Sequence, residues 1–497
     1  MKIPRIVKAM EHLDAELISE ASEEPRKKHA WKPIAAIAAC LCLVIGAVQL
    51  FQQIGGSSGA GSQPRRDGDI HYMYYAGPLL PLTAQGATES LTVSRHVDYD
   101  FSVYLPVEEN EKGQTRLAQS VVTDRYVLHN ETQQDQTLTF YYPFVGNMRE
   151  WEQYPVVTAD GENVETVLRP GPYPPSIAEK MPPLDGYAGY ASLLEDGSYL
   201  SSATDSFPTL DVPAVVYELH NYQYTENPDA ISPTLLMEFT VDPEKTKVFS
   251  YGMNIGSWDE ETGHCGRAVS GIKIVGNDHR EPEPAYVILV GEDIADYTLQ
   301  GYRDGGCDAG EELADLSCTV TRYETTLEQV IHPLMTHFLG TFLHQDQAMQ
   351  PLDLYDGLTA ELLWSRGSIM AFPTNQYDMG MLENIFSVVF TDTRVLYQSW
   401  ELTIPAGEET EIQVVLRKDA SRDYAGRYKE RNGYDMATTL GSSLHFTQQS
   451  ASVSHTEGIE IADQNFGFDL QKGITDVTLD LEIPHYWMEI RKISEKS

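Results

Sequence analysis

The feature that constrains this chain most is an uninterrupted apolar stretch near its amino terminus. Residues 33–51 form a run of 19 residues without a charged side chain. An α-helix rises about 1.5 Å per residue, so such a run reaches roughly across the 30 Å hydrocarbon core of a bilayer. The stretch therefore predicts a transmembrane helix over residues 33–53, which divides the chain into a short tail and a large body.

Two other interpretations of this stretch compete with an uncleaved anchor. A secretory signal peptide has a short charged region and an apolar core of about 7–15 residues, whereas here the polar residues 1–30 come first. The small residues of 55–60 would suit a signal peptidase. A buried core helix is the third interpretation. The length of the stretch and its flanks favour the anchor over both alternatives.

The charges on either side of the stretch predict its orientation. Four basic residues lie shortly before it, namely Arg26, Lys27, Lys28 and Lys32. Arg65 and Arg66 follow it at a greater distance. Since positive residues stay on the cytoplasmic side, we expect a single-pass cell-membrane protein with its amino terminus inside and its bulk outside.

The negative charge of the protein lies almost entirely in the body. The formal net charge is −39, and residues 1–32 hold seven basic and six acidic side chains. The rest of the chain therefore carries 28 basic and 68 acidic residues. Such a surface repels nucleic acid, so we expect no nucleic-acid partner. It is typical of a solvated acidic exterior, or of a body that attracts cations and basic partners.

The tail, residues 1–32, has the periodicity of an amphipathic helix. Its apolar positions recur at steps of four, three, four and one, and they are Ile6, Met10, Leu13, Leu17 and Ile18. One interpretation is a juxtamembrane helix that lies on lipid or pairs with itself. The other is a docking helix for a cytoplasmic regulatory protein.

The tail and the apolar stretch together resemble a known group of proteins. The residues that carry the likeness are 10–21, the Lys/Arg patch, Trp31 and the Ala-rich run 38–45. This arrangement resembles single-span membrane-anchored proteins of Clostridia-type Gram-positive bacteria, several of which are anti-sigma-factor-like or uncharacterised. Their usual acidic pair is reduced to Asp14 here, and no Cys/His zinc-binding set accompanies the helix. The resemblance implies membrane topology and a regulatory partner.

Beyond a flexible Gly/Ser tether over residues 54–69, the body predicts a mainly β fold. Alternating runs at 98–105, 120–130, 137–144 and 164–168 predict strands, and the polar turn at 131–136 predicts a hairpin. These phrases resemble bacterial surface β-sandwiches. We expect one β-rich domain over 70–230, with an irregular Pro/Tyr-rich loop from residue 170 onward.

The second half of the body predicts further strands around a helical insertion. Strands are expected at 235–241, 247–252, 285–291, 384–391, 400–416 and 477–484. The turn at 404–412 resembles the penultimate hairpin of immunoglobulin-like bacterial domains. A helical insertion is expected over about 311–366, with helices at 326–339 and 353–363. These elements define a second β-rich region over 231–497.

The body contains none of the common motifs of catalytic, nucleotide or metal sites. No GxSxG, P-loop, GxGxxG with a ribose acid, HExxH or CxxC motif occurs. His332, His337 and His344 are five and seven apart, whereas two ligands on one helix face lie three or four apart. The acids of 293–312 do not match a calcium loop. We therefore expect no catalytic residue, cofactor or metal site.

Two features of the body allow more than one interpretation. Three cysteines lie outside the apolar stretch, namely Cys265, Cys307 and Cys318, and any pair could form a disulfide. The cluster around Trp258 and Asp259 is the most site-like group of acids, although it also fits an exposed turn.

The sequence thus favours a mainly β protein with an N-terminal helix, one transmembrane helix and a β-sandwich-like ectodomain with a small helical insertion. The function that it favours is binding or sensing of an unknown extracellular ligand, within an anti-sigma-like envelope regulatory system. The alternatives are a non-signalling cell-surface interaction protein and an uncharacterised hydrolase. The bilayer itself is the expected partner of residues 33–51.

Overall fold

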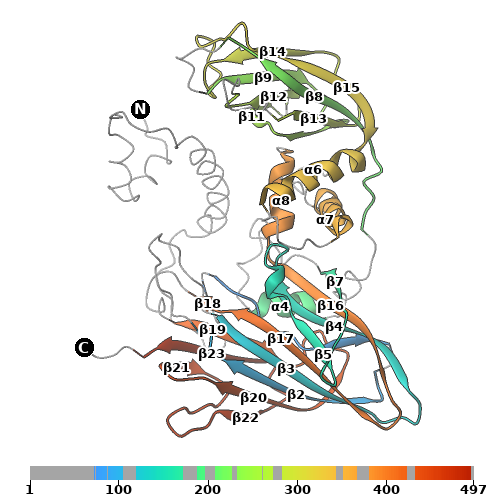
Figure 1. Cartoon of the computed structure of the whole chain (residues 1–497), viewed down its shortest axis with the longest axis vertical. Helices are drawn as coiled ribbons and strands as arrows, with labels where there is room; N and C mark the ends of the chain where they lie inside the picture. Colours follow the sequence, from blue (N-terminus) through green and yellow to red (C-terminus); the bar gives the residue numbers. More distant parts are fainter. Residues whose placement is uncertain are drawn as a thin grey trace. The chain divides into compact units, whose positions relative to one another are not determined.

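The computed structural model divides the chain into two compact units, residues 1–64 and 65–497. All described residues lie in the second unit (Figure 1), and they are 72, 74–86, 88–104, 119–171, 187–195, 207–225, 232–259, 261–272, 283–342, 351–365, 380–422 and 431–493. The expected tail helix, transmembrane helix and tether lie outside them. So do the docking and topology-setting residues Ile6, Met10, Leu13, Leu17, Ile18, Arg26, Lys27, Lys28 and Lys32. No helix in the described ranges has the length and apolarity needed to cross a membrane.

The largest sheet has seven strands, and the described part of the chain is mainly β, as expected. Its strand order is β22-β20-β2-β3-β17-β5-β6. Neighbours pair antiparallel except β2 and β20, which are parallel. Alternation of buried and half-buried residues along β2 shows that one face of this sheet packs on a core. The strands are β2 (Leu91–Asp100), β3 (Gln119–Asn130), β5 (Val156–Ala159), β6 (Glu162–Asn163), β17 (Glu409–Asp419), β20 (His445–Ser454) and β22 (Asp476–Leu479).

Two four-stranded sheets share the core of the seven-stranded sheet. The first is β1 (Thr83–Gln85), β4 (Gln136–Gly146), β16 (Arg394–Ile404) and β7 (Val167–Pro170). The second is β18 (Ser421–Arg422), β19 (Asn432–Ala437), β23 (His485–Lys492) and β21 (Ile459–Gln464). We call these three sheets, with the 3-10 helix η1 (Trp151–Gln153) and helix α4 (Tyr187–Leu194), the base. Trp400 lies in its core beside Phe140, with ring centroids 6.0 Å apart.

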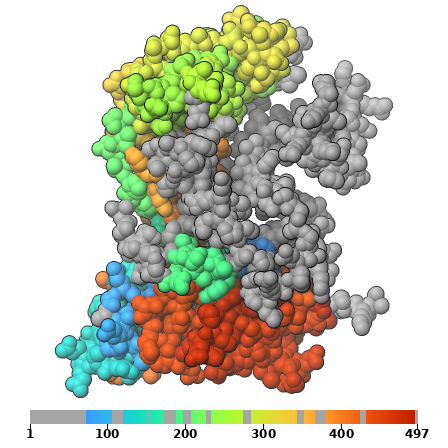
Figure 2. Space-filling view, turned by 180° about the vertical axis from the view of Figure 1, so that it is seen from behind, coloured from blue at the N-terminus to red at the C-terminus, as the bar shows by residue number. Residues whose placement is uncertain are grey.

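Helix α4 packs on the C-terminal strands of the base. In Figure 2 these strands form a continuous orange and red surface, and α4 lies against it in green. The ring of Tyr187 stacks on His485 with centroids 3.8 Å apart, and Tyr190 is buried against Ala437. This helix falls in the stretch that we expected to be an irregular loop.

Both hairpins that we expected in the base are wrong. β3 pairs with β2 and β17, whereas β4 pairs with β1 and β16, so the turn at 131–135 crosses from one sheet to another. The turn between β16 and β17 crosses back in the same way. Alternation predicts a strand but not the strand with which it pairs. The short turns between consecutive strands therefore suggested hairpins that do not form.

Asn130 holds these two crossing turns together. Its buried side-chain amide donates to the carbonyl oxygens of Ile404 and Pro405, at 3.0 and 3.1 Å. The amide also donates to the Gln134 carbonyl, and its oxygen accepts the backbone N–H of Thr132. A residue that matches a glycosylation sequon is therefore a structural clamp between two turns.

A second module is inserted between β7 and β16 of the base. The chain leaves the base after Pro170 and returns at Arg394, and these two strands pair with each other. We call residues 207–392 the inserted module. Arg394 is buried at the junction, where its Nε donates to the Gly171 carbonyl and its Nη atoms contact the Glu361 carboxylate.

Two four-stranded sheets of the inserted module pack face to face around their own core. One is β10 (Lys247–Tyr251), β13 (Ala285–Val290), β8 (Pro213–Gln223) and β15 (Ser317–Thr326). The other is β11 (Asn254–Asp259), β12 (His264–Val269), β9 (Thr234–Thr240) and β14 (Tyr297–Tyr302). β8 lies in the stretch that we expected to be irregular. The expected domain boundary at 230/231 falls between β8 and β9, inside this module.

Three helices follow these strands: α6 (Leu327–Phe342), α7 (Leu352–Ser365) and α8 (Leu382–Thr391). The expected helices at 326–339 and 353–363 correspond to α6 and α7. The expected strand at 384–391 is wrong, because its apolar residues follow helical spacing and α8 buries Leu382, Ile385, Phe386 and Val389 on one side. The expected helical start near residue 311 is also wrong, because β15 occupies 317–326.

Candidate ligand-binding site

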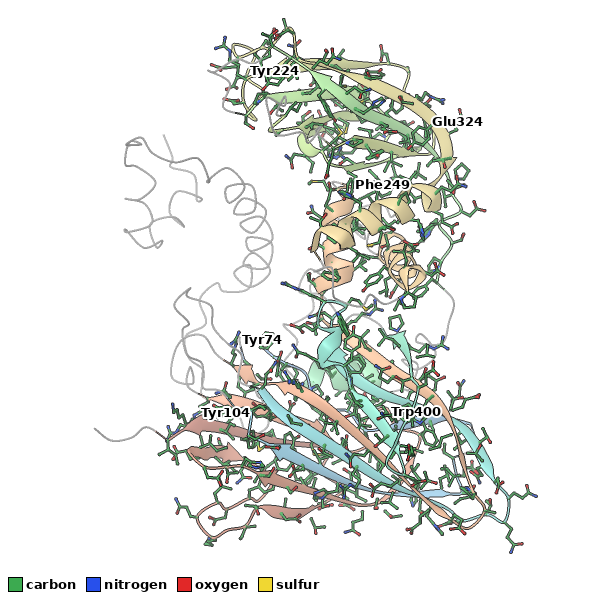
Figure 3. The ribbon with its side chains drawn as sticks, in the orientation of Figure 1. Tyr74, Tyr104, Tyr224, Phe249, Glu324 and Trp400 are labelled. Atoms are coloured by element: carbon green, nitrogen blue, oxygen red, sulfur yellow. The ribbon has the colours of Figure 1, made fainter. Side chains whose placement is uncertain are left out.

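The surface most suited to hold a ligand lies on the outer face of sheet β10-β13-β8-β15. Cross-strand register places Phe249, Ile288, Val216 and Tyr323 in one row across its four strands. Directly opposed residues in a sheet share a face. The first three residues of this row are fully buried against the helices, and Figure 3 shows Phe249 where the sheet meets them.

The next row, one pleat along, is where the surface opens. It consists of Tyr251, Tyr286, Glu218 and Thr321. Side chains two residues apart on a strand share a face, so this row continues the apolar row toward the edge of the helix layer. Tyr251 is buried, whereas Tyr286 and Tyr323 are half-buried. The three tyrosine rings therefore lie at the edge of the sheet surface that the helices cover.

Helix α6 forms the opposite wall. Val330 and Leu334 are spaced four apart and pack into the core, and His337 follows at the next position on the same face. The start of the helix is fixed by Leu327, whose backbone N–H donates to the Val212 carbonyl. Pro333 lies inside the helix on the pocket wall and offers no N–H.

These walls border an open pocket of about 230 Å³, which we call the tyrosine pocket. Its lining residues combine three aromatic rings, apolar contacts and a few polar groups. They are Tyr251, Glu283, Pro284, Tyr286, Tyr323, Gln329, Val330, Pro333, Leu334 and His337. A mostly apolar pocket with a few convergent polar groups is the usual form of a small-ligand site.

The polar groups of the tyrosine pocket are held in place by one another. His337 Nε2 lies 3.1 Å from Glu283 Oε2. The ring of Tyr251 lies edge-on to the His337 ring, with centroids 6.1 Å apart, and 6.5 Å from the Tyr286 ring. Aromatic pairs prefer such tilted arrangements, so the rings are positioned before a ligand arrives.

Burial and nearby carboxylates keep the tyrosine hydroxyls protonated. Burial raises the pKa of Tyr251, and the charges of Glu383 and Glu283 raise it further. Burial followed by the charge of Glu218 raises the pKa of Tyr286, and the same causes raise the pKa of Tyr323 to about 12. At neutral pH each hydroxyl can therefore donate a hydrogen bond to a ligand.

Glu383 stands behind the tyrosine pocket at the start of α8. Its Oε1 accepts the backbone N–H of Gly252, next to Tyr251, while its Oε2 is buried without a hydrogen-bond partner among the described residues. Burial raises the pKa of this carboxyl to about 7, and the Gly252 N–H counteracts part of that shift. A carboxyl that titrates near neutrality thus supports one wall.

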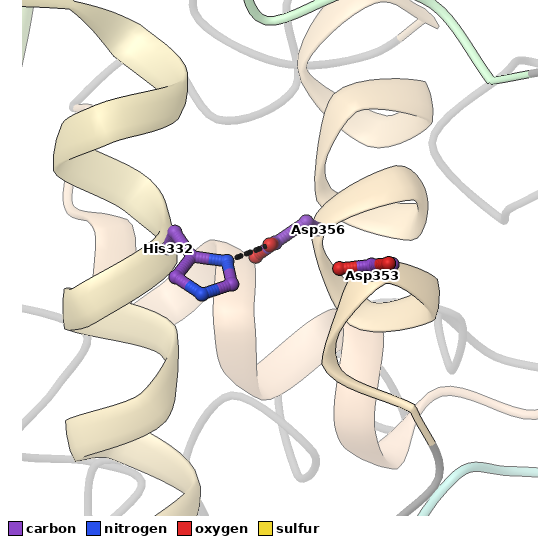
Figure 4. Close-up of side chains that lie close together, drawn as sticks. All are labelled: His332, Asp353 and Asp356. Atoms are coloured by element: carbon purple, nitrogen blue, oxygen red, sulfur yellow. Dashed lines mark hydrogen bonds and ion pairs between the residues drawn. The ribbon is translucent and has the colours of Figure 1, made fainter.

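A second cluster, His332 with Asp353 and Asp356, lies between α6 and α7 (Figure 4). One ligand atom from each residue lies within 4.8 Å of the others, and His332 Nδ1 is 2.5 Å from Asp356 Oδ2. Burial raises the pKa of Asp356, and the bond to His332 opposes this. The short His–Asp contact is a hydrogen bond that joins the two helices.

Among the described residues, two hydroxyls close to this pair along α6 and α7 are already engaged. The neighbouring hydroxyls of Thr336 and Thr359 donate to carbonyls of their own helices, those of His332 and Tyr355. A pair can act as a catalytic base only when a reacting group lies within its reach. The arrangement therefore suits a structural link between α6 and α7.

A third candidate is a cavity of about 50 Å³ in the base, beside Lys418. Lys418 is buried, and its ammonium donates to the Ala76 carbonyl at 2.6 Å. Burial lowers the pKa of Lys418, and Asp435 and Asp419 oppose this. A cavity of this size holds a few water molecules and is too small for a drug-sized ligand.

The residues that the sequence suggested for a disulfide, an acidic site or a metal site do not form a common site in the described part of the chain. Cys265, Cys307 and Cys318 are free thiols, so no disulfide joins them. Asp259 accepts the backbone N–H groups of Glu261 and Thr262, as in a plain exposed turn. His332 and His337 face different partners, Asp356 and Glu283.

Sequence reasoning missed the tyrosine pocket. Its tyrosines lie on three separate strands, at 251, 286 and 323, and only the register brings them together. The available signal was the tyrosine at the end of β10 and near the start of β13, whereas Tyr323 lies within the polar strand β15 and gave no such signal.

Comparison with known proteins adds no relative from which a function could be transferred. No family model matches the chain, and no curated protein matches it.

Proposed function

We propose that the chain is a single-span membrane protein that binds an extracellular ligand in the tyrosine pocket. The observation that carries the proposal is the tyrosine pocket itself, about 230 Å³ of space lined by positioned rings and polar groups. The tyrosine pocket lies on the inserted module. Changes in its walls therefore need not disturb the three sheets of the base. The base, in this account, is the support.

The apolar stretch supports the location of this binding function. Residues 33–51 would anchor the chain, and the basic residues before them would keep the tail inside. The acidic body would then stand outside on its Gly/Ser tether. A β-sandwich-like ectodomain of this kind is suited to present a site away from the membrane.

The experiment that tests the binding proposal compares pocket variants on cell envelopes. Full-length protein would be incubated with envelope fragments from cells that lack it, and the bound fraction would be measured. We expect Tyr286→Ala with Tyr323→Ala to reduce binding by about ten-fold, since each lost aromatic contact is worth about 0.5–1.5 kcal/mol. Tyr297→Ala is the matched control, because Tyr297 is an exposed tyrosine of β14 outside the tyrosine pocket. Equal binding of wild type and the pocket variant would reject the proposal.

Signalling through the tail is a separate part of the proposal. Deleting residues 1–30 should abolish capture of a cytoplasmic regulatory protein and alter envelope-stress transcription. If neither changes, the protein is a surface interaction protein without a signalling role.

A further inference from the structure

We propose that the tyrosine pocket recognises a positively charged group with an apolar surface, such as a quaternary ammonium. This inference rests on the proposed binding function and names the chemical class of its ligand. It follows from the ring faces, from the charges around them and from the size of the cavity.

The rings provide surfaces that attract a cation. Each aromatic face carries partial negative charge, and a cation within about 6 Å of a ring centroid is attracted to it. Tyr251, Tyr286 and Tyr323 come from three strands of one sheet and line the same cavity. Tyr251 and Tyr286 are inclined to each other by 58°. Rings tilted in this way can face one small group from different sides.

The charged residues around the rings have the same sign. Glu283 lines the cavity, and Glu218 lies opposite Tyr286 on the neighbouring strand. Glu383 supports the wall behind Tyr251. Among the described residues, no Lys or Arg lines the cavity, and the histidine that does, His337, contacts Glu283. An anionic ligand would be repelled by these carboxylates, whereas a cation would be stabilised.

Among the described residues, the basic side chains nearest to Tyr323 and Tyr251 on their own strands point elsewhere. Arg322 precedes Tyr323 on β15, so its side chain lies on the opposite face of the strand. There its Nε donates to Asp293 at 2.9 Å. Lys247, at the other end of β10, donates to the Pro243 carbonyl at 2.8 Å. Neither of these two residues neutralises the carboxylates of the tyrosine pocket.

The volume limits what can enter. Pockets for drug-sized ligands measure about 300–1,000 Å³, and the tyrosine pocket, with about 230 Å³, is smaller. It therefore fits a headgroup or one side chain of a larger molecule. A trimethylammonium group meets all three conditions, because its methyl groups contact rings and its charge needs no hydrogen-bond acceptor.

Calorimetric titration of the full-length protein tests this inference. The protein would be held in phosphatidylglycerol nanodiscs, whose lipid has no quaternary amine. The probes are choline, its uncharged isostere 3,3-dimethylbutan-1-ol, and glucose. We expect choline to bind at least about five-fold more tightly than the isostere, because the isostere lacks the cation–ring attraction.

Variants assign the binding to the tyrosine pocket. Tyr286→Ala and Glu283→Gln should each weaken choline binding about three- to ten-fold, whereas Tyr286→Phe, which keeps the ring face, should change it less than about two-fold. Tyr297→Ala should leave it unchanged. Thermal unfolding of each variant checks that the fold is retained.

The outcomes separate this inference from the proposed function. Equal affinity for choline and its uncharged isostere would overturn the cation assignment. Tighter binding of glucose, lost in Tyr286→Ala, would overturn it while leaving a ligand site in place. If no probe binds while the pocket variants still lose binding to envelopes, the cation assignment falls and the proposed function stands. If envelope binding is also unaffected, both fall.

Discussion

Arg95 and Asp124 form a fully buried ion pair in the core of the base. Both side chains have zero exposure, and two parallel hydrogen bonds of 2.8 Å join them. The hydroxyls of Tyr126 and Tyr142 donate to the same carboxylate. Burial alone would lower the pKa of Arg95, but the charge of Asp124 holds it above its ordinary value. Each buried charge is compensated only while its partner is present, so removal of either one destabilises the fold.

Asp124→Asn should therefore lower the free energy of unfolding by about 3–5 kcal/mol, because it leaves a buried guanidinium without its counter-charge. Urea unfolding followed by circular dichroism measures the change. Glu411→Gln is the control, since Glu411 pairs with Arg125 at 3.7 Å on the surface and both side chains are nearly half exposed. The control should change stability by less than about 1 kcal/mol. Equal effects of the two substitutions would contradict this account.

Arg267 presents the opposite case, a buried guanidinium with no acidic partner in the part of the chain that the structure describes. It is 1% exposed on the inner face of β12, and its Nε and Nη1 have no hydrogen-bond partner among the described residues. Burial lowers its pKa. Since an uncompensated buried charge is costly, Arg267→Met should raise the free energy of unfolding by about 1–4 kcal/mol. A loss of stability in urea unfolding would show that the guanidinium has a compensating partner in solution.

Glu383 should make stability depend on pH. Its carboxyl has a pKa of about 7 in the folded protein against an ordinary value of 4.5. The folded state therefore holds this proton more tightly than the unfolded state does. The contribution is fully present below about pH 4.5 and is lost as pH rises through 7.

The measurement is a comparison of Glu383→Gln with wild type across this range. Near pH 8 the variant should be more stable than wild type by about 1–3 kcal/mol, because it avoids a buried charge. Near pH 4.5 the two should differ little. A difference that stays constant between these two pH values would mean that the pKa of Glu383 is the same in the folded and unfolded protein.

At the scale of elements, the two crossing turns depend on Asn130. Its amide bonds carbonyl groups of the turn after β16, and its oxygen fixes the turn after β3. Asn130→Ala should cost about 1–3 kcal/mol, because the buried carbonyls lose their donor. Denaturant unfolding measures this. Asn163→Ala, at an exposed position of β6, is the control and should have little effect; equal losses would contradict the clamp.

The elements themselves were largely predictable from the sequence, but their partners were not. Alternation in β3, β4, β9 and β17 and the helical spacing in α6 and α7 predicted these elements close to their bounds. α8 was mistaken for a strand because its Val and Phe residues favour strands, although their spacing is helical. Pairing depends on contacts far apart in sequence, such as β2 with β20 or β7 with β16. Local periodicity does not contain that information.

The candidate site was less predictable for the same reason. Tyr251, Tyr286 and Tyr323 lie on strands that join only through register, and Glu218 comes from a stretch expected to be irregular. Catalytic and metal sites often have motifs with fixed spacing, which can be recognised in a sequence. A pocket built from single residues of several strands has no such spacing.

At the scale of the whole molecule, we expect a membrane anchor to precede a base that supports an inserted module. The base is continuous in structure but not in sequence, since β7 and β16 lie on either side of the inserted module. The anchor, tether and tail remain expectations from sequence. A Gly/Ser tether transmits little torque, so any signal would pass by clustering or proteolysis.

Hydrogen–deuterium exchange of the full-length protein tests the central claim, ligand binding in the tyrosine pocket, most directly. Exchange would be measured in nanodiscs with and without soluble fragments of the cell envelope. The account predicts slower exchange in residues 283–290 and 323–337, which carry the pocket walls, and no change in β2 and β3 of the base. Slower exchange confined to the base, or no difference at the pocket walls, would contradict it.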